Sequence, residues 1–123
     1  MASERPVDLN EQERREFPRI RAFGELHGRP VPLQVTLVLE DLSLGGFSIE
    51  SPLDFRPGVE YWFELIGRDG AAMLRAICMH CAGTSPFYGA DYFAGFRFAR
   101  TDEKDIEAIG AMVDGLLTAR TSG

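Results

Sequence analysis

The chain has 123 residues, 45% of them hydrophobic and 26% charged, which is sufficient for a single globular domain with one core. Its formal net charge of −6 argues against a protein that binds long nucleic acid or an anionic membrane surface. No apolar run approaches membrane-spanning length, and the polar N-terminal segment lacks the apolar stretch of a signal peptide. These features predict a cytoplasmic protein that does not insert into membranes.

The N-terminal segment differs from the rest of the chain. Residues 1–12 are polar and have no periodicity, which predicts a flexible arm before one domain over residues 13–119. A local basic cluster follows, whereas the acidic residues are spread along the chain; the cluster consists of Arg14, Arg15, Arg19 and Arg21. Such a cluster on an acidic protein suits a small anion better than a long polyanion.

Most of the domain has the pattern of β-strands. In the segment VEYWFELI, strict alternation places Phe63 and Leu65 on one face and Glu64 on the other. The pair Asp69-Gly70 predicts a tight turn between two strands. The expected strands are residues 17–26, 31–40, 47–51, 59–66, 71–81 and 90–99.

The last segment changes to helical periodicity. Apolar residues recur at helical spacing, and acidic residues in the first turn follow a capping residue at Thr101 or Asp102. The apolar positions are Ile106, Ile109, Met112, Val113, Leu116 and Leu117. We therefore expect a mainly β protein, a small antiparallel six-stranded β-barrel, with a C-terminal α-helix over about residues 102–119.

Other patterns that could carry chemistry are weak. Cys78 and Cys81 lie three apart on a predicted strand and should point to opposite faces, which disfavours a disulfide. The sequence Cys-Met-His-Cys at 78–81 lacks a fourth ligand for structural zinc. Neither histidine has the context of a catalytic triad. These observations predict neither a metal site nor an enzyme.

Aromatic residues are concentrated near the last predicted strand. They could form the base-stacking face of a single-strand nucleic-acid binder, or they could fill the core of the barrel. The acidic charge balance favours the core. The residues are Phe87, Tyr88, Tyr92, Phe93, Phe96 and Phe98, with Asp91 beside them.

A first motif, Arg-Arg-Glu-Phe-Pro-Arg, occupies residues 14–19. Pro18 disfavours a helical conformation at Phe17, so we expect Arg15 and Arg19 on an extended entry into the first strand. An arginine side chain offers a planar fork of donors that matches phosphate oxygens and also the O6 and N7 acceptors of guanine. Taken alone, this arginine pair would be interpreted as a solvated basic segment.

A second motif, Asp-Leu-Ser-Leu-Gly-Gly, occupies residues 41–46 between two predicted strands. The carboxylate of Asp41 can accept hydrogen bonds from the ring N–H and amino group of a base, and Ser43 can bond to a base edge or a phosphate. Gly45 and Gly46 permit a positive φ angle and let a ligand approach the backbone closely. Taken alone, this motif would be interpreted as an ordinary turn.

Together, R-x-x-x-R in the first motif and D-x-S-x-x-G in the second resemble the PilZ domain family. The strand pattern after the second motif, the Gly-Phe-Arg-Phe segment and the closing helix fit as well, so the resemblance covers roughly residues 13–118. PilZ domains are small β-barrels that bind the bacterial second messenger cyclic di-GMP. The resemblance therefore implies a stand-alone receptor for cyclic di-GMP that passes its signal to an unidentified output protein.

In this family the first motif lies on an arm that wraps around the ligand. The resemblance implies that Arg15 and Arg19 hold guanine edges and phosphates. It also implies that Asp41 and Ser43 contact a guanine and that Gly46 keeps the turn open to the ligand, and we place the adjacent glycine, Gly45, in the same site. Binding would order the arm and alter a surface that the partner protein reads.

Arg14 lies just before the first motif arginine, at a position that in the family influences whether one messenger or a stacked pair is bound. An arginine there could stack on a guanine or contact a phosphate, or it could simply be solvated, and both interpretations stay open. No cofactor or metal is expected besides this ligand, and we expect a monomer or weak dimer. The alternative function is a ligand-independent PilZ-type adaptor in motility or exopolysaccharide regulation.

Overall fold

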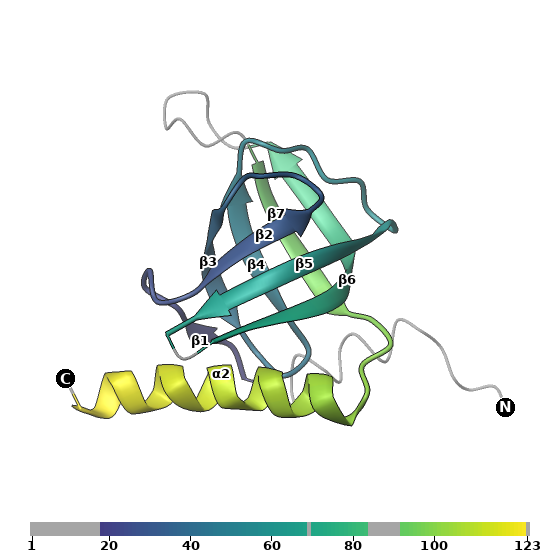
Figure 1. Cartoon of the computed structure of the whole chain (residues 1–123). Helices are drawn as coiled ribbons and strands as arrows, with labels where there is room; N and C mark the ends of the chain where they lie inside the picture. The colour runs from purple at the N-terminus through teal and green to yellow at the C-terminus, as the bar shows by residue number, and fades with distance from the viewer. Residues whose placement is uncertain (1–17, 69, 84–91, 123) are drawn as a thin grey trace, which may run out of the picture.

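The computed structural model describes residues 18–68, 70–83 and 92–122. This part of the chain consists of short and long strands followed by one helix (Figure 1). The strands are β1 (Ile20–Arg21), β2 (His27–Val31), β3 (Leu37–Leu42), β4 (Gly46–Ser51), β5 (Glu60–Gly67), β6 (Gly70–Gly83) and β7 (Tyr92–Phe98), and the helix is α2 (Glu103–Ser122).

Six of these strands close into a barrel. Neighbouring strands pair in the order β3–β2–β5–β6–β7–β4, every pair is antiparallel, and β4 pairs with β3 to complete the ring. The short strand β1 pairs with the C-terminal end of β3, next to the part of β3 that pairs with β2. The prediction of a mainly β, six-stranded antiparallel barrel with a C-terminal helix is therefore confirmed. Closure removes the unpaired edges that an open sheet would expose.

The first predicted strand is wrong in its extent. Within residues 17–26, the described part forms a strand only over β1, which ends at Arg21. A turn follows, in which Phe23 and Gly24 adopt positive φ angles of 48° and 81°. Left-handed backbone reverses the chain direction and cannot continue a strand, so the apolar residues here pack around a turn.

The predicted strand over residues 31–40 is also wrong in its extent, because the chain leaves the sheet between β2 and β3. Pro32 has no N–H to donate to a ladder, so β2 ends before it, and the sheet resumes only at Leu37. The strand β2 was missed because its sequence, His-Gly-Arg-Pro-Val, contains glycine and proline, which are depleted in strands. The barrel is therefore closed by a strand, β2, that its residue types do not predict.

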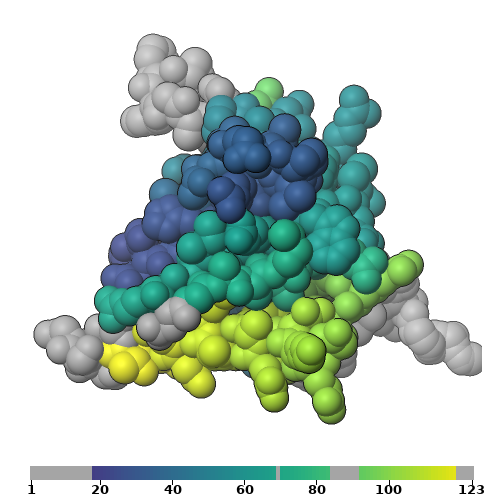
Figure 2. Space-filling model, in the orientation of Figure 1, coloured from purple at the N-terminus to yellow at the C-terminus, as the bar shows by residue number. Residues whose placement is uncertain are grey.

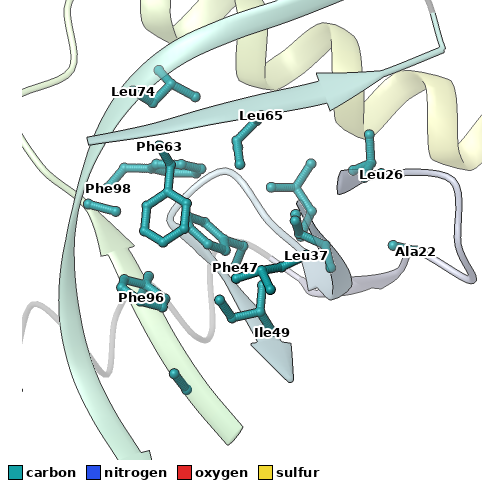
Figure 3. Packing of buried hydrophobic residues seen from close by; sticks show 14 of the residues in the cluster. Ala22, Leu26, Leu37, Phe47, Ile49, Phe63, Leu65, Leu74, Phe96 and Phe98 are labelled. Atoms are coloured by element: carbon teal, nitrogen blue, oxygen red, sulfur yellow. The ribbon is translucent and has the colours of Figure 1, made fainter. Parts of the chain in front are cut away.

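The barrel encloses a core of aromatic and aliphatic side chains (Figure 3). Phe47 stacks on Phe96 with ring centroids 5.0 Å apart and meets Phe63 edge-on at 5.1 Å. The alternation predicted in VEYWFELI is confirmed, because Phe63 is fully buried while Trp62 is 47% exposed. Phe96 and Phe98 are both buried, so these two aromatic residues belong to the core rather than to a stacking face. Phe87, Tyr88 and Asp91 lie outside the described residues.

The strands β3 and β6 each contain a register shift of the β-bulge type. In β3 the shift lies between Leu39 and Asp41, and Leu39 and Leu42 are both buried although they are three residues apart. A regular strand would point such residues to opposite faces, whereas the extra residue of a bulge turns both inward. The shift in β6 lies between Cys78 and His80.

This second bulge corrects the prediction that the two cysteines point to opposite faces. Cys78 is fully buried, and Cys81 is partly buried against the same core. Both thiols are free. Burial raises the pKa of Cys78 to about 11 and also raises the pKa of Cys81, so both stay protonated at neutral pH. Among the described residues, no three histidine, cysteine or acidic side chains form a group that could hold a metal ion.

The helix α2 lies across one end of the barrel (Figures 1 and 2). It begins with a reciprocal cap, in which the Asp105 N–H donates to Asp102 Oδ1 at 2.9 Å and the Asp102 N–H donates to Asp105 Oδ2 at 3.2 Å. Of the two predicted capping residues, Asp102 therefore makes the cap. No helix in the described ranges is long and apolar enough to cross a membrane.

The buried face of α2 is narrower than the sequence pattern predicts. Ile109 and Leu116 are buried in the barrel's core cluster, and two further predicted positions, Met112 and Val113, pack partly against it. Ile106 at the start of the helix is 55% exposed, and Leu117 near its end is also exposed. The helix therefore covers the end of the barrel with one narrow row of apolar side chains.

Candidate functional site

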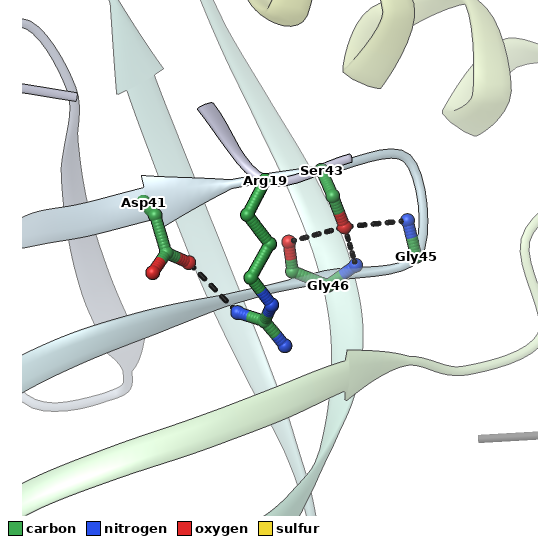
Figure 4. A network of polar contacts seen from close by, with 5 residues as sticks. All are labelled: Arg19, Asp41, Ser43, Gly45 and Gly46. Carbon is green, nitrogen blue, oxygen red and sulfur yellow. Dashed lines mark hydrogen bonds and ion pairs between the residues drawn. The ribbon is translucent and has the colours of Figure 1, made fainter. Parts of the chain in front are cut away.

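The second motif forms a turn that is organised by Ser43 (Figure 4). The backbone N–H of Ser43 donates to the carbonyl oxygen of Gly46 at 2.8 Å. In return, Ser43 Oγ accepts hydrogen bonds from the N–H groups of Gly45 at 3.1 Å and Gly46 at 3.2 Å. Ser43 is 4% exposed, so its hydroxyl is committed to the turn. This side chain shapes the loop between β3 and β4 from inside.

Asp41 is not part of this turn, because it lies within β3, next to the bulge. Its Oδ1 accepts a hydrogen bond from Arg19 Nη1 at 2.8 Å, and the two side chains are 19% and 41% exposed (Figure 4). β1 pairs with β3 through Arg21 opposite Asp41, which places Arg19 just before this pairing and beside the carboxylate. The structure therefore brings one residue of each motif into direct contact.

The glycines of the second motif do not adopt the positive φ angles that glycine permits. Among the described glycines, positive φ angles occur at Gly24, Gly58 and Gly70, so neither Gly45 nor Gly46 needs one here. A Cβ on Gly46 would instead lie 2.0 Å from the carbonyl oxygen of Phe96 on β7. Gly46 is required because two backbones approach closely, and the Gly45 carbonyl accepts the Phe98 N–H at 2.9 Å on the same side.

The strand pairing places a row of residues beside Asp41 on the outside of the barrel. Across β3, β4, β7 and β6, Asp41 lies opposite Ser48, Ser48 opposite Gly95, and Gly95 opposite His80. Phe47 and Ile49 point into the core, so Ser48 between them points outward. We use the name site face for these outward residues and their neighbours. The row itself is Asp41, Ser48, Gly95 and His80, and the neighbours are Glu40, Gly46, Glu50, Phe93 and Arg97.

The site face has small residues at its centre and an unsatisfied hydroxyl among them. Gly46, Ser48 and Gly95 carry little or no side chain. Ser48 is 3% exposed, yet its Oγ has no hydrogen-bond partner within the described residues. Such a group is uncommon in native proteins, because it loses its bonds to water without replacement. The sequence interpretation missed Ser48, Gly95 and His80, because only the strand order makes them neighbours of Asp41.

Acidic side chains also crowd onto one border of the site face. The bulge in β3 leaves Glu40 on the outside next to Asp41. Burial, followed by repulsion from Glu50 on β4, raises the pKa of Glu40, while Arg21 acts in the opposite direction. Repulsion between two neighbouring carboxylates lowers the stability of the folded protein.

Not every residue of the first motif falls within the described part of the chain. Arg14 and Arg15 are outside the described residues. Arg19, Asp41, Ser43, Gly45 and Gly46 form one contiguous group at the ends of β1, β3 and β4.

The described residues also line a pocket of about 430 Å³ between α2 and the β5–β6 hairpin, and none of its lining residues belongs to this group. Its lining is mainly small and apolar, including Gly67, Ala72 and Met112. Its one cation, Arg68, is paired with Glu25 at 3.4 Å. The cavity therefore lacks an unpaired charge that could recognise an anion, and we do not assign the motif chemistry to it.

A sequence model of the PilZ domain matches residues 13–115. The chain belongs to the PilZ domain family. A comparison with curated proteins gave no match. The family assignment rests on the matched residues, which include both motifs, the barrel strands and most of α2.

Solved structures of other PilZ proteins share the fold. The PilZ domain of YcgR from Escherichia coli, solved with c-di-GMP, superposes with a TM-score of 0.71 at 18% identity, over 89% of this chain and 95% of that one. The K. pneumonia MrkH–c-di-GMP complex gives 0.70 at 13% identity, over 100% of this chain and 57% of MrkH. The Bacillus subtilis inhibitor of motility, MotI/DgrA, gives 0.64 at 15% identity, over 85% and 52%. This chain therefore spans about half of MrkH and MotI, and at these identities the likeness shows the fold.

Proposed function

We propose that this PilZ protein is a receptor for cyclic di-GMP, held between the first motif and the site face. The observation that carries the proposal is the ion pair between Arg19 and Asp41, which lie 22 residues apart in the sequence and belong to different motifs. Membership of the PilZ family supports the same ligand, as do the YcgR and MrkH structures, which contain c-di-GMP.

Arg19 provides donors for a guanine edge or a phosphate. A guanidinium has five N–H donors, and the hydrogen bond to Asp41 uses one Nη1 donor. The side chain is 41% exposed, so its remaining donors are accessible. Because Asp41 already fixes the direction of the fork, less side-chain entropy is lost when a ligand binds.

Asp41 provides the complementary acceptor. A carboxylate has about four lone-pair positions, and the bond from Arg19 occupies one of those on Oδ1. The rest can accept the ring N–H and amino group of a guanine. At 19% exposure this side chain is partly removed from water, which strengthens a charge-assisted hydrogen bond.

The other motif residues complete the proposed site. Arg15 would supply a second fork from the arm, and Arg14 would stack on a guanine if a pair of messengers is bound. Ser43 and the motif glycines would contribute through the shape of the turn, since the Ser43 hydroxyl already bonds to Gly45 and Gly46. Ordering of the arm on the barrel would change the surface that an output protein contacts.

The experiment is calorimetric titration with cyclic di-GMP of the wild type, Arg19→Ala and Asp41→Ala. We expect binding by the wild type and at least about tenfold weaker binding by each variant, because a charge-assisted contact is worth about 1.5 kcal/mol or more. Arg68→Ala is the matched control, since it removes an arginine from a separate ion pair, that with Glu25 near the β5–β6 turn, and should leave the affinity unchanged. Wild-type protein whose thermal stability does not respond to saturating ligand would contradict the proposal.

One observation favours the alternative function of a ligand-independent adaptor. On the outside of β2 and β5, Val31 and Trp62 lie opposite each other and are 42% and 47% exposed. Exposed apolar residues that are neighbours can form part of a protein-binding surface. The adaptor function predicts that a partner binds through Trp62 equally well with and without cyclic di-GMP. The titration separates the two functions, because an adaptor of this kind does not bind the messenger.

A further inference from the structure

The site face continues well beyond the motif residues. Asp41, Ser48, Gly95 and His80 follow one another across four paired strands. Three strand spacings of 4.7 to 4.9 Å separate the first from the last, or about 14 Å. A ligand with two bases that is bound by Asp41 can therefore extend across this row towards His80.

Backbone irregularities flank the row at both of its ends. One bulge lies beside Asp41 in β3, and the other lies beside His80 in β6. Each bulge leaves two consecutive residues on the outside, namely Glu40 with Asp41 and Met79 with His80. Bulges are frequent next to functional sites, because they redirect a side chain without disturbing the core.

The centre of the row contains a buried hydroxyl that points outward. Ser48 Oγ has no partner within the described part of the chain, although the residue is 3% exposed. Phe47 and Ile49 on either side are fully buried in the core, which fixes the outward direction of Ser48. A bound group that donates to or accepts from this hydroxyl would supply the missing hydrogen bond.

The far end of the row carries two aromatic rings outside the core. A Cβ added to Gly95 would lie 2.4 Å from His80 Nε2, so the imidazole lies over the bare backbone of Gly95. The His80 ring is parallel to that of Phe93, with an interplanar angle of 8° and centroids 6.4 Å apart. His80 is exposed and Phe93 is half-buried. Exposed, parallel aromatic faces are surfaces on which nucleobases stack.

A positive charge lies on the same face. Arg97 on β7 is opposite Gly46 on β4, two residues beyond Gly95. It points outward, because Phe96 and Phe98 on either side point into the core. A phosphate that crosses the small central residues would therefore pass close to this guanidinium.

We propose that His80 and Phe93 form a stacking surface for a purine base and that Ser48 hydrogen-bonds to the same ligand between this surface and Asp41. The inference rests on the proposed function, since it assigns the second base of cyclic di-GMP to this part of the site face. The first base is bound at Asp41 and Arg19, and the second stacks over the strand pair β6–β7.

The experiment is calorimetric titration of the full chain with cyclic di-GMP, using His80→Ala, His80→Phe and Ser48→Ala. Loss of one stacked base should weaken binding about tenfold in His80→Ala, whereas His80→Phe keeps an aromatic face and should retain most of the affinity. Met79→Ala is the matched control, because Met79 is the exposed neighbour in the same bulge and should bind like the wild type.

Ser48→Ala separates a binding role from a structural one. It should weaken binding about threefold or more, since one hydrogen bond to the ligand is lost. Without ligand, its melting temperature should equal or exceed that of the wild type, because the variant removes an unsatisfied buried hydroxyl.

The titrations distinguish the two levels of the proposal. If the wild type binds and Asp41→Ala does not, but His80→Ala and Ser48→Ala bind like the wild type, then the stacking surface is refuted and the receptor function stands. If the wild type itself does not bind cyclic di-GMP, then the receptor function fails and the inference fails with it.

Discussion

Two surfaces on the outside of the barrel differ in how well their polar and charged groups are paired. On the outside of β2 and β5, which form the near side in Figure 1, charged residues face partners of opposite sign. Arg29 is hydrogen-bonded to Glu64 directly across the strand pair. Arg75 on β6 pairs with Glu60 at 3.5 Å and lies 5.0 Å from the ring centroid of Trp62. We call this group of residues the paired face.

The site face is less complementary, although its Asp41 is paired with Arg19. It carries two glycines at its centre, a buried Ser48 hydroxyl with no partner among the described residues, and two acidic side chains, Glu40 and Glu50, that repel each other. Features that lower stability are expected where a surface is shaped for binding rather than for folding. The comparison teaches that one face of the barrel is stabilised by paired charges, whereas the site face keeps a buried hydroxyl that has no partner within the described residues.

The largest expected effect is a loss of stability when a side chain is added at a glycine on β4, compared with a glycine on β2. Gly46→Ala places a Cβ 2.0 Å from the Phe96 carbonyl oxygen, which cannot move without disturbing the β4–β7 pairing. We expect the free energy of unfolding to fall by about 3 kcal/mol, measured by chemical denaturation. In Gly28→Ala on β2, the nearest atom is the flexible Leu39 Cδ1 at 3.1 Å, and the loss should be about 1 kcal/mol or less. Equal losses in the two variants would contradict this account.

A smaller effect is expected on the paired face. Trp62→Ala removes the contact between the indole and the Arg75 guanidinium, so the free energy of unfolding should fall by about 1 kcal/mol. Binding of cyclic di-GMP should be unchanged, since Trp62 lies on the other wall. A variant that keeps its stability but binds the messenger more weakly would show that the two walls are not independent.

The smallest expected effect is a change in the free energy of unfolding that has opposite signs on the site face and the paired face. At pH 7, Glu40→Gln should raise the free energy of unfolding by about 0.5 kcal/mol, because it removes repulsion from Glu50. Glu64→Gln should lower it by a similar amount, because it weakens the ion pair with Arg29. The same sign for both substitutions would refute the difference between the faces.

The gain from Glu40→Gln should also depend on pH. The pKa of Glu40 is raised in the folded protein, so on acidification the native state takes up this proton before the unfolded chain does. The wild type therefore loses the cost of the charged carboxylate as the pH falls from 7 towards the ordinary value of 4.5. We expect the advantage of Glu40→Gln to shrink over this range, as measured by denaturation at several pH values.

Features that depend on neighbouring residues could be predicted from the sequence. Alternation identified β5, and the Asp102 cap with helical spacing identified α2, because both patterns are local consequences of backbone geometry. The two motifs were expected to share a site, and the structure brings one residue of each, Arg19 and Asp41, into contact. These signals need no knowledge of strand order.

The predictions that were wrong involve chain geometry that local patterns do not record. The bulges at Asp41 and His80 reverse the inside–outside order of the residues that follow, so simple alternation misplaced Cys81. Gly46 was expected to permit a positive φ angle, but it adopts none, and a Cβ there would meet the backbone of a strand some fifty residues later.

The sequence by itself therefore determined the class of fold, the terminal helix and the two motifs, because these follow from residue type and short-range spacing. Only the tertiary structure decided that β2 closes the barrel and that Ser48, Gly95 and His80 continue the row from Asp41. The physical reason is that hydrogen bonds between strands bring together residues from distant parts of the chain. Which residues become neighbours depends on the order and register of the strands, and these are settled when the barrel closes around its core.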